Sequence, residues 1–386
     1  MMQHKYRKYR QLTIAGQTYN PEALFHLSEE KLTDEHVPAW EKEIYRFILE
    51  WLSDEDTILV QTSGSTGTPK KMPVRKDAML QSAFNTIDFF GLTPGMSALL
   101  CLPVNYIAGR MMIVRAFAGG LDLVPVPVTG RPLQHLAGPV DFASMIPLQM
   151  MNELSVEPSR LHFLRTVMLG GSAVSNELVR KLENQTFRAW ETYGMTETLS
   201  HIALRPLNGN ESSMTRLSQK NMDKTESCEF HQTNILNKFY TDEKNNFFTP
   251  LKNVRIFTDE RNCLVVDAAG ITNTPVVTND IVEINKNGTF RIKGRIDNII
   301  NTGGVKVSPE EIEQRLSGLV PEPFYISSRP HPSLGNEVVL VVPRKPDNVD
   351  ALLQRLRNVL PPYHAPKDVV VKQPFRMTES GKIRRD

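Results

Sequence analysis

A run of hydroxyl residues, two glycines and a lysine, at 62–70, predicts chemistry more directly than any other segment. It reads TSGSTGTPK and follows a predicted strand at 57–61. Glycines let backbone N–H groups approach an anion closely, hydroxyls donate further hydrogen bonds, and lysine adds positive charge. The spacing G-x-x-G-x-x-K differs from that of a Walker A loop. The run therefore predicts a phosphate-binding loop of another kind, rather than a flexible Ser/Gly linker. The residues expected to bind phosphate are Thr62, Ser63, Gly64, Ser65, Thr66, Gly67 and Lys70.

Short apolar runs alternate with helical stretches from residue 57 to about 190. Strands are predicted at 57–61, 97–103, around 142–146 and at 166–171, and helices at 76–91, 107–120 and 148–154. This alternation is typical of a mostly parallel sheet covered by helices, an α/β fold. A ligand site in such a sheet lies at the carboxyl ends of its strands.

The alternation of strands and helices ends near residue 206, and a polar segment follows. The segment 206–250 is rich in Asn, Ser, Thr, Lys and Glu with little periodicity, so an exposed polar insertion is expected there, with a substrate lid as an alternative. A hairpin is predicted at 254–258 and 263–267. A smaller α+β unit then begins near residue 295, where Ser308 and Pro309 mark a helix start. Further elements of this unit are predicted at 337–342 (strand), 349–360 (helix) and 368–372 (strand).

The composition indicates an ordinary globular protein of two or three units. The 386 residues are 40% hydrophobic and 23% charged, and the formal net charge is +2. Such a charge gives no reason to expect nucleic acid or an acidic membrane as partner. The three cysteines lack metal-type spacing and suggest a reducing compartment. No window approaches the roughly 18 apolar residues of a membrane helix, so we expect a cytoplasmic protein without membrane insertion. The oligomeric state stays open, with a homodimer as one option.

The run TSGSTGTPK resembles the phosphate-binding signature of the adenylate-forming (ANL, AMP-binding) superfamily. Two further segments resemble that family in the expected order. GGSA at 170–173 resembles its adenine-flanking turn, and YGMTET at 193–198 resembles its second core motif. The resemblance implies that Thr196 contacts the α-phosphate of ATP and that Glu197 helps to hold Mg²⁺, as suits a carboxylate and a hard cation. The other residues implied to contact the nucleotide are Gly171, Ser172, Ala173, Tyr193, Gly194 and Met195.

Three later segments extend the resemblance to residue 382. Asp280 stands where the family has an Asp that binds the ribose hydroxyls, although Asn279 replaces the usual glycine. Arg295 would also reach the nucleotide and Asp297 would be the pivot of the hinge, with a plain structural salt bridge as the alternative. TESGKI at 378–383 resembles the motif whose lysine, here Lys382, completes the adenylation site.

The resemblance implies a large N-terminal domain, 1–294, and a small mobile C-terminal domain, 295–386, with the hinge at 295–297. Because only 61 residues precede the phosphate loop, the N-terminal subdomain is expected to be truncated. ATP, Mg²⁺ and coenzyme A are the implied cofactor and co-substrates. The implied reaction makes an acyl-adenylate, with Lys382 bridging the substrate carboxylate and the α-phosphate. The small domain then rotates and the acyl group passes to coenzyme A.

The acid is indicated by the segment 100–117, LCLPVNYIAGRMMIVRAF. Among short family members it most resembles the o-succinylbenzoate–CoA ligases of menaquinone biosynthesis. That resemblance implies that Tyr106 lines the acyl pocket. The second carboxylate of such a dianion needs a cation or several donors; the candidates are Ser200 and His201 first, then Arg110 and Arg115.

Other functions remain open on the sequence alone. One is another aryl- or acyl-CoA ligase, acting on a benzoate, a coumarate-like acid or a fatty acid. Another is a stand-alone adenylation domain that loads a carrier protein. Amino-acid-activating members place an Asp within the segment 100–109, and none occurs there. A luciferase-type oxygenase and a degenerate nucleotide-binding protein are less favoured, the latter because the key charged residues are all present.

Overall fold

The computed structural model describes residues 5–61, 71–208, 247–321, 323–375 and 385. The predicted phosphate loop 62–70, Lys382 and most of the predicted insertion 206–250 therefore lie outside the described residues. The chain packs into two compact units. The first holds Met1–Ala173, Lys181–Arg255 and Asp267–Val276, and the second holds Val174–Arg180, Ile256–Val266 and Val277–Asp386. This division differs from the predicted boundary between residues 294 and 295, which remains a prediction.

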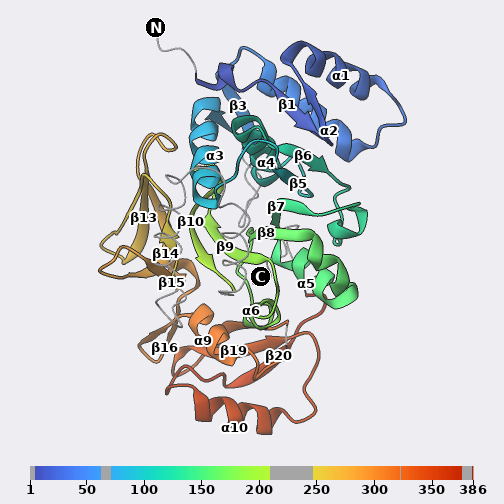
Figure 1. Ribbon diagram of the computed structural model, residues 1–386. Helices are drawn as coiled ribbons and strands as arrows, with labels where there is room; N and C mark the ends of the chain where they lie inside the picture. Colours follow the sequence, from blue (N-terminus) through green and yellow to red (C-terminus); the bar gives the residue numbers. More distant parts are fainter. Residues whose placement is uncertain (1–4, 62–70, 209–246, 322, 376–384, 386) are drawn as a thin grey trace. The chain divides into compact units, whose positions relative to one another are not determined.

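The described part of the first unit contains a nine-stranded sheet with the order β11-β10-β9-β8-β7-β5-β6-β1-β2 (Figure 1). Neighbouring strands from β9 to β1 run parallel, whereas β1–β2, β9–β10 and β10–β11 are antiparallel. The strands are β1 (Leu12–Ile14), β2 (Gln17–Tyr19), β5 (Ser97–Leu100), β6 (Asp122–Pro125), β7 (Val140–Met145), β8 (Leu164–Leu169), β9 (Arg188–Gly194), β10 (His201–Pro206) and β11 (Thr249–Pro250). The predicted mostly parallel sheet is confirmed.

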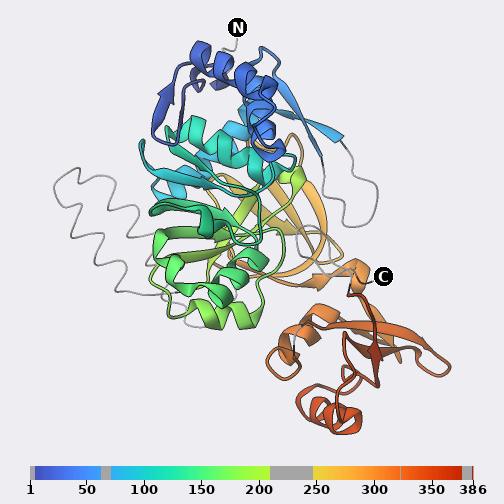
Figure 2. The same cartoon turned by 90° about the vertical axis from the view of Figure 1, so that its right-hand side faces the viewer.

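Helices accompany this sheet in both views (Figures 1 and 2). They are α1 (Pro21–Thr33), α2 (Ala39–Leu52), α3 (Lys76–Phe90), α4 (Ile107–Gly119) and α5 (Pro147–Val156), with 3-10 turns η1 (Lys5–Lys8), η2 (Pro132–His135), η3 (Pro158–Phe163) and η4 (Thr196–Thr198). A further helix, α6 (Asn176–Leu182), belongs mostly to the second unit. The central strands β7 and β8 are buried almost throughout, as expected for strands covered on both faces. The predicted helices at 76–91 and 107–120 correspond to α3 and α4.

The predicted strand at 57–61 exists but does not join the parallel sheet. It is β3 (Thr57–Gln61), and it pairs antiparallel with β4 (Lys71–Arg75), so that Gln61 faces Lys71. The physical reason is that Met72 and Val74 continue an in–out pattern directly after the 62–70 run, and Val74 is buried. The predicted phosphate loop thus connects the two strands of a hairpin.

Described residues also form a four-stranded sheet with the order β12-β13-β14-β15. Its strands are β12 (Val254–Thr258), β13 (Cys263–Ala268), β14 (Val276–Ile284) and β15 (Phe290–Arg295). The predicted hairpin at 254–258 and 263–267 corresponds to β12 and β13. The antiparallel pair β14–β15 places Asp280 directly opposite Arg295, and the 3-10 turn η5 (Ile296–Asn298) follows β15.

The second unit contains a small α+β subdomain, made of one sheet and two helices (Figure 2, orange to red). In its described part β17-β16-β19-β18 are neighbours and β20 pairs with β19. Its elements are β16 (Ile300–Thr302), β17 (Val305–Val307), α9 (Pro309–Leu316), β18 (Tyr325–His331), β19 (Gly335–Val342), α10 (Val349–Val359) and β20 (Asp368–Val371). The helix start at Ser308 is confirmed, because the Ser308 side chain accepts a hydrogen bond from the N–H of Glu311.

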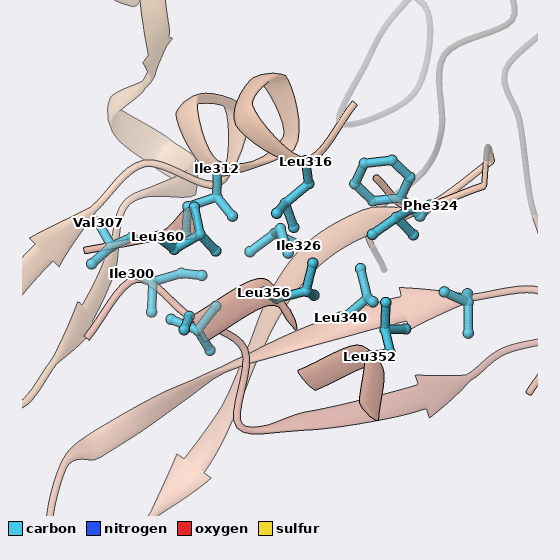
Figure 3. Close-up of a cluster of buried hydrophobic side chains, with 14 residues drawn as sticks. Ile300, Val307, Ile312, Leu316, Phe324, Ile326, Leu340, Leu352, Leu356 and Leu360 are labelled. Atoms are coloured by element: carbon cyan, nitrogen blue, oxygen red, sulfur yellow. The ribbon is translucent and has the colours of Figure 1, made fainter. Parts of the chain in front are cut away.

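A buried apolar cluster holds this small sheet and its two helices together. Figure 3 shows Ile312 and Leu316 of α9 and Leu352 and Leu356 of α10 beside Leu340 of β19. The i, i+4 spacing on each helix creates one apolar stripe, and the strand contributes its alternate residues. In the part of the chain that the structure describes, no helix is long and apolar enough to cross a membrane.

Candidate active site

Three candidate segments follow the carboxyl ends of parallel strands in the large sheet. β5, β8 and β9 run in one direction, because β5–β7, β7–β8 and β8–β9 are all parallel pairs. Tyr106 follows β5, 171–173 follow β8, and Thr196 and Glu197 follow β9. The described candidates of the first unit therefore lie along the edge where a parallel sheet binds its ligands.

The turn after β9 is closed by the hydroxyl of Thr198. Its Oγ1 accepts a hydrogen bond from the N–H of Met195 at 3.1 Å and donates to the carbonyl oxygen of Ser200 at 2.8 Å. Leu199, which follows, is buried and has φ +64°, a backbone conformation that bulky residues rarely adopt. Strain of this kind persists only where surrounding contacts impose it, and it is concentrated at functional sites. The turn is therefore held in one shape.

Glycine is required at position 194 by a close approach of two strands. A Cβ there would lie 2.3 Å from the carbonyl oxygen of Ser200 and 2.5 Å from the Cα of His201. Gly171 has φ +87°, which suits glycine in the turn after β8. Gly171 and Gly194, two of the glycines predicted to contact the nucleotide, are thus each required by the local backbone.

Glu197 is the carboxylate expected to hold Mg²⁺. It is exposed on the turn η4, and Thr196 beside it is half-buried. Among the described residues, no group of three or more His, Cys, Asp or Glu side chains could form a metal site. Mg²⁺ is commonly held by one or two carboxylates together with substrate phosphates and water. A lone exposed carboxylate at this edge fits such an ion.

A buried polar cluster joins α3, α4 and the start of β10. Arg115 of α4 donates from Nη2 to Ser200 Oγ at 2.8 Å and from Nε to Thr86 Oγ1 at 3.1 Å. His201 lies between the same partners, with Nδ1 3.3 Å from Ser200 Oγ and Nε2 3.4 Å from Thr86 Oγ1. Ser200 and His201, both predicted for the acyl site, therefore contact each other directly, and Arg115 joins them through Ser200 and Thr86.

The charge of this cluster comes from its arginine. Arg115 is only 1% exposed, and burial lowers its pKa from 12.5 to about 9, so the guanidinium remains positive at neutral pH. Burial and the nearby Arg115 hold the pKa of His201 well below 6.5, so the imidazole is neutral. No carboxylate of the described residues forms an ion pair with Arg115. A buried cation without an acidic partner is costly and marks a functional site candidate.

The neighbouring face of α3 carries buried polar atoms with unsatisfied hydrogen bonds. Ser82 Oγ and Asn85 Nδ2 are buried and find no partner among the described residues. Thr86 lies on the same helix and was not among the predicted site residues. The signal that could have found it is the polar stripe 82, 85 and 86, whose i, i+3 and i+4 spacing places three polar residues on one face in the middle of the helix.

Arg110 lies elsewhere and binds main-chain carbonyls. Its Nε donates to the carbonyl oxygen of Val104 at 2.9 Å, and its Nη1 donates to that of Leu59 at 2.7 Å. It also pairs with Glu50 at 3.4 Å, and its guanidinium lies over the ring of Phe47. Arg110 thus ties the loop before Tyr106 to β3, the strand that leads into the 62–70 run. The structure does not bring it together with Ser200 and His201.

An apolar cavity of about 260 Å³ lies between α2 and the loops after β5 and β6. Trp40 and Ile44 of α2 line one side, and Val104, Asn105 and Val126 line the other. Its volume is below the roughly 300–1,000 Å³ of most small-molecule sites. None of the residues of the Arg115 cluster line it.

The remaining described candidates, Asp280, Arg295 and Asp297, meet in the second unit. Arg295 bridges the two carboxylates, with Nη1 3.1 Å from Asp280 Oδ1 and Nη2 2.8 Å from Asp297 Oδ2. The hydrogen bond from Arg295 holds the pKa of Asp297 below its usual value of 3.8. All three side chains are partly exposed, so the bridge is open to exchange with a ligand.

A family comparison decides what these segments belong to. Residues 10–222 match the family described as AMP-binding enzyme, which is more than half of the chain. The chain belongs to the AMP-binding enzyme family. This match includes the 62–70 run, the turn after β8 and the turn after β9, the segments in which the sequence predicted nucleotide contacts.

Similar AMP-binding enzymes include curated proteins and solved structures. The 2-succinylbenzoate–CoA ligase of Salmonella typhimurium is 26% identical over 290 residues, which cover 74% of this chain and 58% of that ligase. An acyl-CoA synthetase (AMP-forming)/AMP-acid ligase II-like protein from Dyadobacter fermentans is 30% identical with a TM-score of 0.57, covering 93% of this chain and 96% of that one.

The o-succinylbenzoate CoA synthetase of Bacillus subtilis, solved in complex with the acyl-adenylate intermediate OSB-AMP, superimposes with a TM-score of 0.68 at 16% identity. The match covers 97% of this chain and 94% of that one. This AMP-binding enzyme family member therefore has the fold of adenylate-forming enzymes. It spans little more than half the length of the Salmonella ligase.

Proposed function

We propose that this protein is an ATP-dependent acid–thiol ligase whose acid is o-succinylbenzoate, as in menaquinone biosynthesis. A carboxylate oxygen attacks the α-phosphorus of ATP, and the bond to pyrophosphate breaks. The thiol of coenzyme A then attacks the acyl carbon, and AMP leaves. Family membership and the named relatives support this reaction.

The first step needs donors in place where negative charge develops. Thr196 would contact the α-phosphate, and the residues of 62–70 would bind the outer phosphates. Lys382 would bridge the carboxylate and the α-phosphate. Mg²⁺ held by Glu197 would neutralise phosphate charge. Asp280 would bind the ribose, and Arg295, already its ion-pair partner, would reach the nucleotide.

The second step would use a different orientation of the C-terminal domain, 295–386. Rotation at 295–297, with Asp297 as the pivot, would withdraw Lys382 and admit the thiol of coenzyme A. The short turn η5 (Ile296–Asn298) between β15 and β16 is compatible with such a hinge. This catalysis belongs to a reducing compartment, the cytoplasm, in keeping with the free buried thiols of Cys101 and Cys263.

The buried guanidinium of Arg115 carries the proposal for the acid. A dianionic acid would bring a second carboxylate to a cation that has no acidic partner among the described residues. Ser200 would share that carboxylate, because it already accepts a hydrogen bond from Arg115. His201 would orient the Ser200 hydroxyl, because its Nδ1 lies 3.3 Å from Ser200 Oγ, and Tyr106 would lie beside the aromatic ring. A fatty acid or plain benzoate would leave the guanidinium unpaired.

The test is pyrophosphate release with ATP and Mg²⁺, measured with and without coenzyme A. The acids would be o-succinylbenzoate, benzoate, coumarate, a medium-chain fatty acid and amino acids. We expect turnover with o-succinylbenzoate to exceed the others by about 100-fold, or about 2.7 kcal/mol. Equal or better turnover with another acid contradicts the substrate and leaves the ligase. Transfer to a carrier protein but not to coenzyme A would favour a stand-alone adenylation domain.

A further inference from the structure

The side chain of Asn279 holds the carboxylate of Asp297. Its Nδ2 donates to both oxygens of that carboxylate, each at 3.1 Å. Asn279 lies on β14, whereas Asp297 lies in the turn η5 that follows β15. The contact therefore spans two segments that are 18 residues apart in the sequence.

Asn279 is itself held from the other side. Arg261 donates from Nη1 to Asn279 Oδ1 at 3.2 Å and from Nη2 to the carbonyl oxygen of Thr278 at 3.1 Å. Arg261 in turn pairs with Asp259 at 2.8 Å. The amide of Asn279 is thereby oriented with its oxygen toward Arg261 and its nitrogen toward Asp297.

Asp297 thus has donors on two sides. Arg295 binds its Oδ2 at 2.8 Å, and Asn279 binds both oxygens from β14. The side chains of Arg261, Asn279, Asp297, Arg295 and Asp280 thus form a continuous hydrogen-bond network from the β12–β13 turn to η5. Any backbone rotation in η5 that swings Asp297 away from β14 must break the two bonds from Asn279.

We propose that Asn279 is a positioning residue that stabilises one orientation of the hinge by holding Asp297. The inference rests on the proposed function for the meaning of the hinge, but the contact itself does not. This chain therefore sets the balance between its two half-reactions partly through residue 279.

The first test needs no substrate. Hydrogen–deuterium exchange would be followed for the peptide 295–302 in the full-length protein and in Asn279→Ala and Asn279→Asp. Asn279→Asp keeps the shape of the side chain but removes the N–H donor and adds a like charge. We expect the peptide to exchange about three- to tenfold faster in both variants, as suits loss of a partly exposed hydrogen bond to a charged group.

The matched control is Asn273→Ala, which truncates an exposed asparagine in the connection before β14. Its exchange at 295–302 should equal that of the unaltered protein. Unchanged exchange in both Asn279 variants would overturn the proposal, whatever the enzyme's substrate proves to be.

The second test compares the two half-reactions in the same variants. Adenylation would be measured as pyrophosphate exchange, and thioester formation would start from a supplied acyl-adenylate. We expect Asn279→Ala to change the ratio of the two rates about threefold or more. A general loss of fold would lower both rates together. Faster exchange with an unchanged ratio would refute the positioning role, and no activity in the unaltered protein would refute the proposed function instead.

Discussion

Arg115 donates a 2.8 Å hydrogen bond to the hydroxyl of Ser200, although 85 positions separate the two residues in the chain. The bond links α4 to the turn that also carries Thr196 and Glu197. Thr198 closes this turn by donating to the carbonyl oxygen of the same Ser200. The proposed acyl cation is therefore bonded to the same turn that carries two of the proposed nucleotide contacts, so a change at one is expected to affect the other.

Replacing Arg115 tests whether it recognises the acid or supports the fold. We expect Arg115→Met to raise the KM for o-succinylbenzoate about 10- to 100-fold, the effect of losing about 1.5–3 kcal/mol from a charge-assisted hydrogen bond. The KM for benzoate should hardly change. Because a buried unpaired cation is costly, the free energy of unfolding should stay the same or rise. Kinetics and urea unfolding would measure the two effects.

The control for Arg115 is Arg165→Ala, which removes a largely exposed arginine paired with Asp141. It should leave both KM values unchanged. A large loss of stability in Arg115→Met, with equal effects on both acids, would show that Arg115 is a structural residue.

The low pKa of His201 predicts a pH dependence of stability. In the unfolded chain the imidazole titrates near 6.5, whereas in the fold it stays neutral far below that value. As the pH falls below 6.5, the unfolded state binds a proton that the folded state does not. The free energy of unfolding should therefore fall by up to about 1.4 kcal/mol per pH unit. His201→Gln should remove this contribution between pH 6.5 and 5.5.

Urea unfolding at pH 7.5, 6.5 and 5.5 measures the difference between the two proteins. His135→Gln, at an exposed position, is the control and should keep the pH dependence of the unaltered protein. An identical slope in His201→Gln would contradict a neutral buried imidazole.

Gly194→Ala tests the close approach behind the predicted nucleotide motif. The new Cβ would lie 2.3 Å from the carbonyl oxygen of Ser200. Because that oxygen belongs to the backbone, relieving the clash requires a backbone shift that costs free energy. We expect a loss of about 1–3 kcal/mol in stability, typical of overpacking, and a larger KM for the acid because Ser200 is displaced. Gly138→Ala is the control, since a Cβ at that position meets no atom within 4 Å. Equal behaviour of the two variants would contradict the close approach.

Most elements could be predicted because their signals are local. The alternation of apolar runs and helical stretches placed α3, α4, β5 and β8, and the Ser308 cap placed α9. The partner of β3 could not be placed this way. Whether a strand joins a parallel sheet or a hairpin depends on which segment it pairs with, and local sequence does not specify that. The short strand β4 follows the polar 62–70 run directly, so its apolar alternation was not recognised as a strand.

Of the two arginines predicted for the acyl site, only one lies beside the other candidates Ser200 and His201. Arg110 and Arg115 lie on one helix, and nothing in their local sequence says which one faces Ser200. Packing decides it: Arg110 binds the carbonyl oxygens of Val104 and Leu59, and Arg115 is buried against Thr86. The role of Asn279 was hidden for a similar reason, because its partner Asp297 is remote in sequence.

The ion pair between Arg385 and Glu313 ties the last described residue to α9. Arg385 donates from Nη1 and Nη2 to the two carboxylate oxygens, each at 2.7 Å, and also to the carbonyl oxygen of Ile326 at 3.0 Å. Burial raises the pKa of Glu313 above 4.5, and the charge of Arg385 opposes that rise. Removing the arginine leaves the carboxylate partly buried with its charge uncompensated.

We expect Arg385→Ala to lower the free energy of unfolding by about 1–3 kcal/mol, less than for a fully buried pair because both side chains keep some exposure. A carboxyl with a raised folded pKa contributes stability at low pH and loses it as the pH rises through that pKa. The cost of Arg385→Ala should therefore be greater at pH 8 than at pH 5, where Glu313 can take up a proton. Calorimetric unfolding at both pH values would show it, with the exposed Arg315→Ala on the same helix as control. A cost that is equal at the two pH values would mean that the carboxylate of Glu313 is not the group left uncompensated.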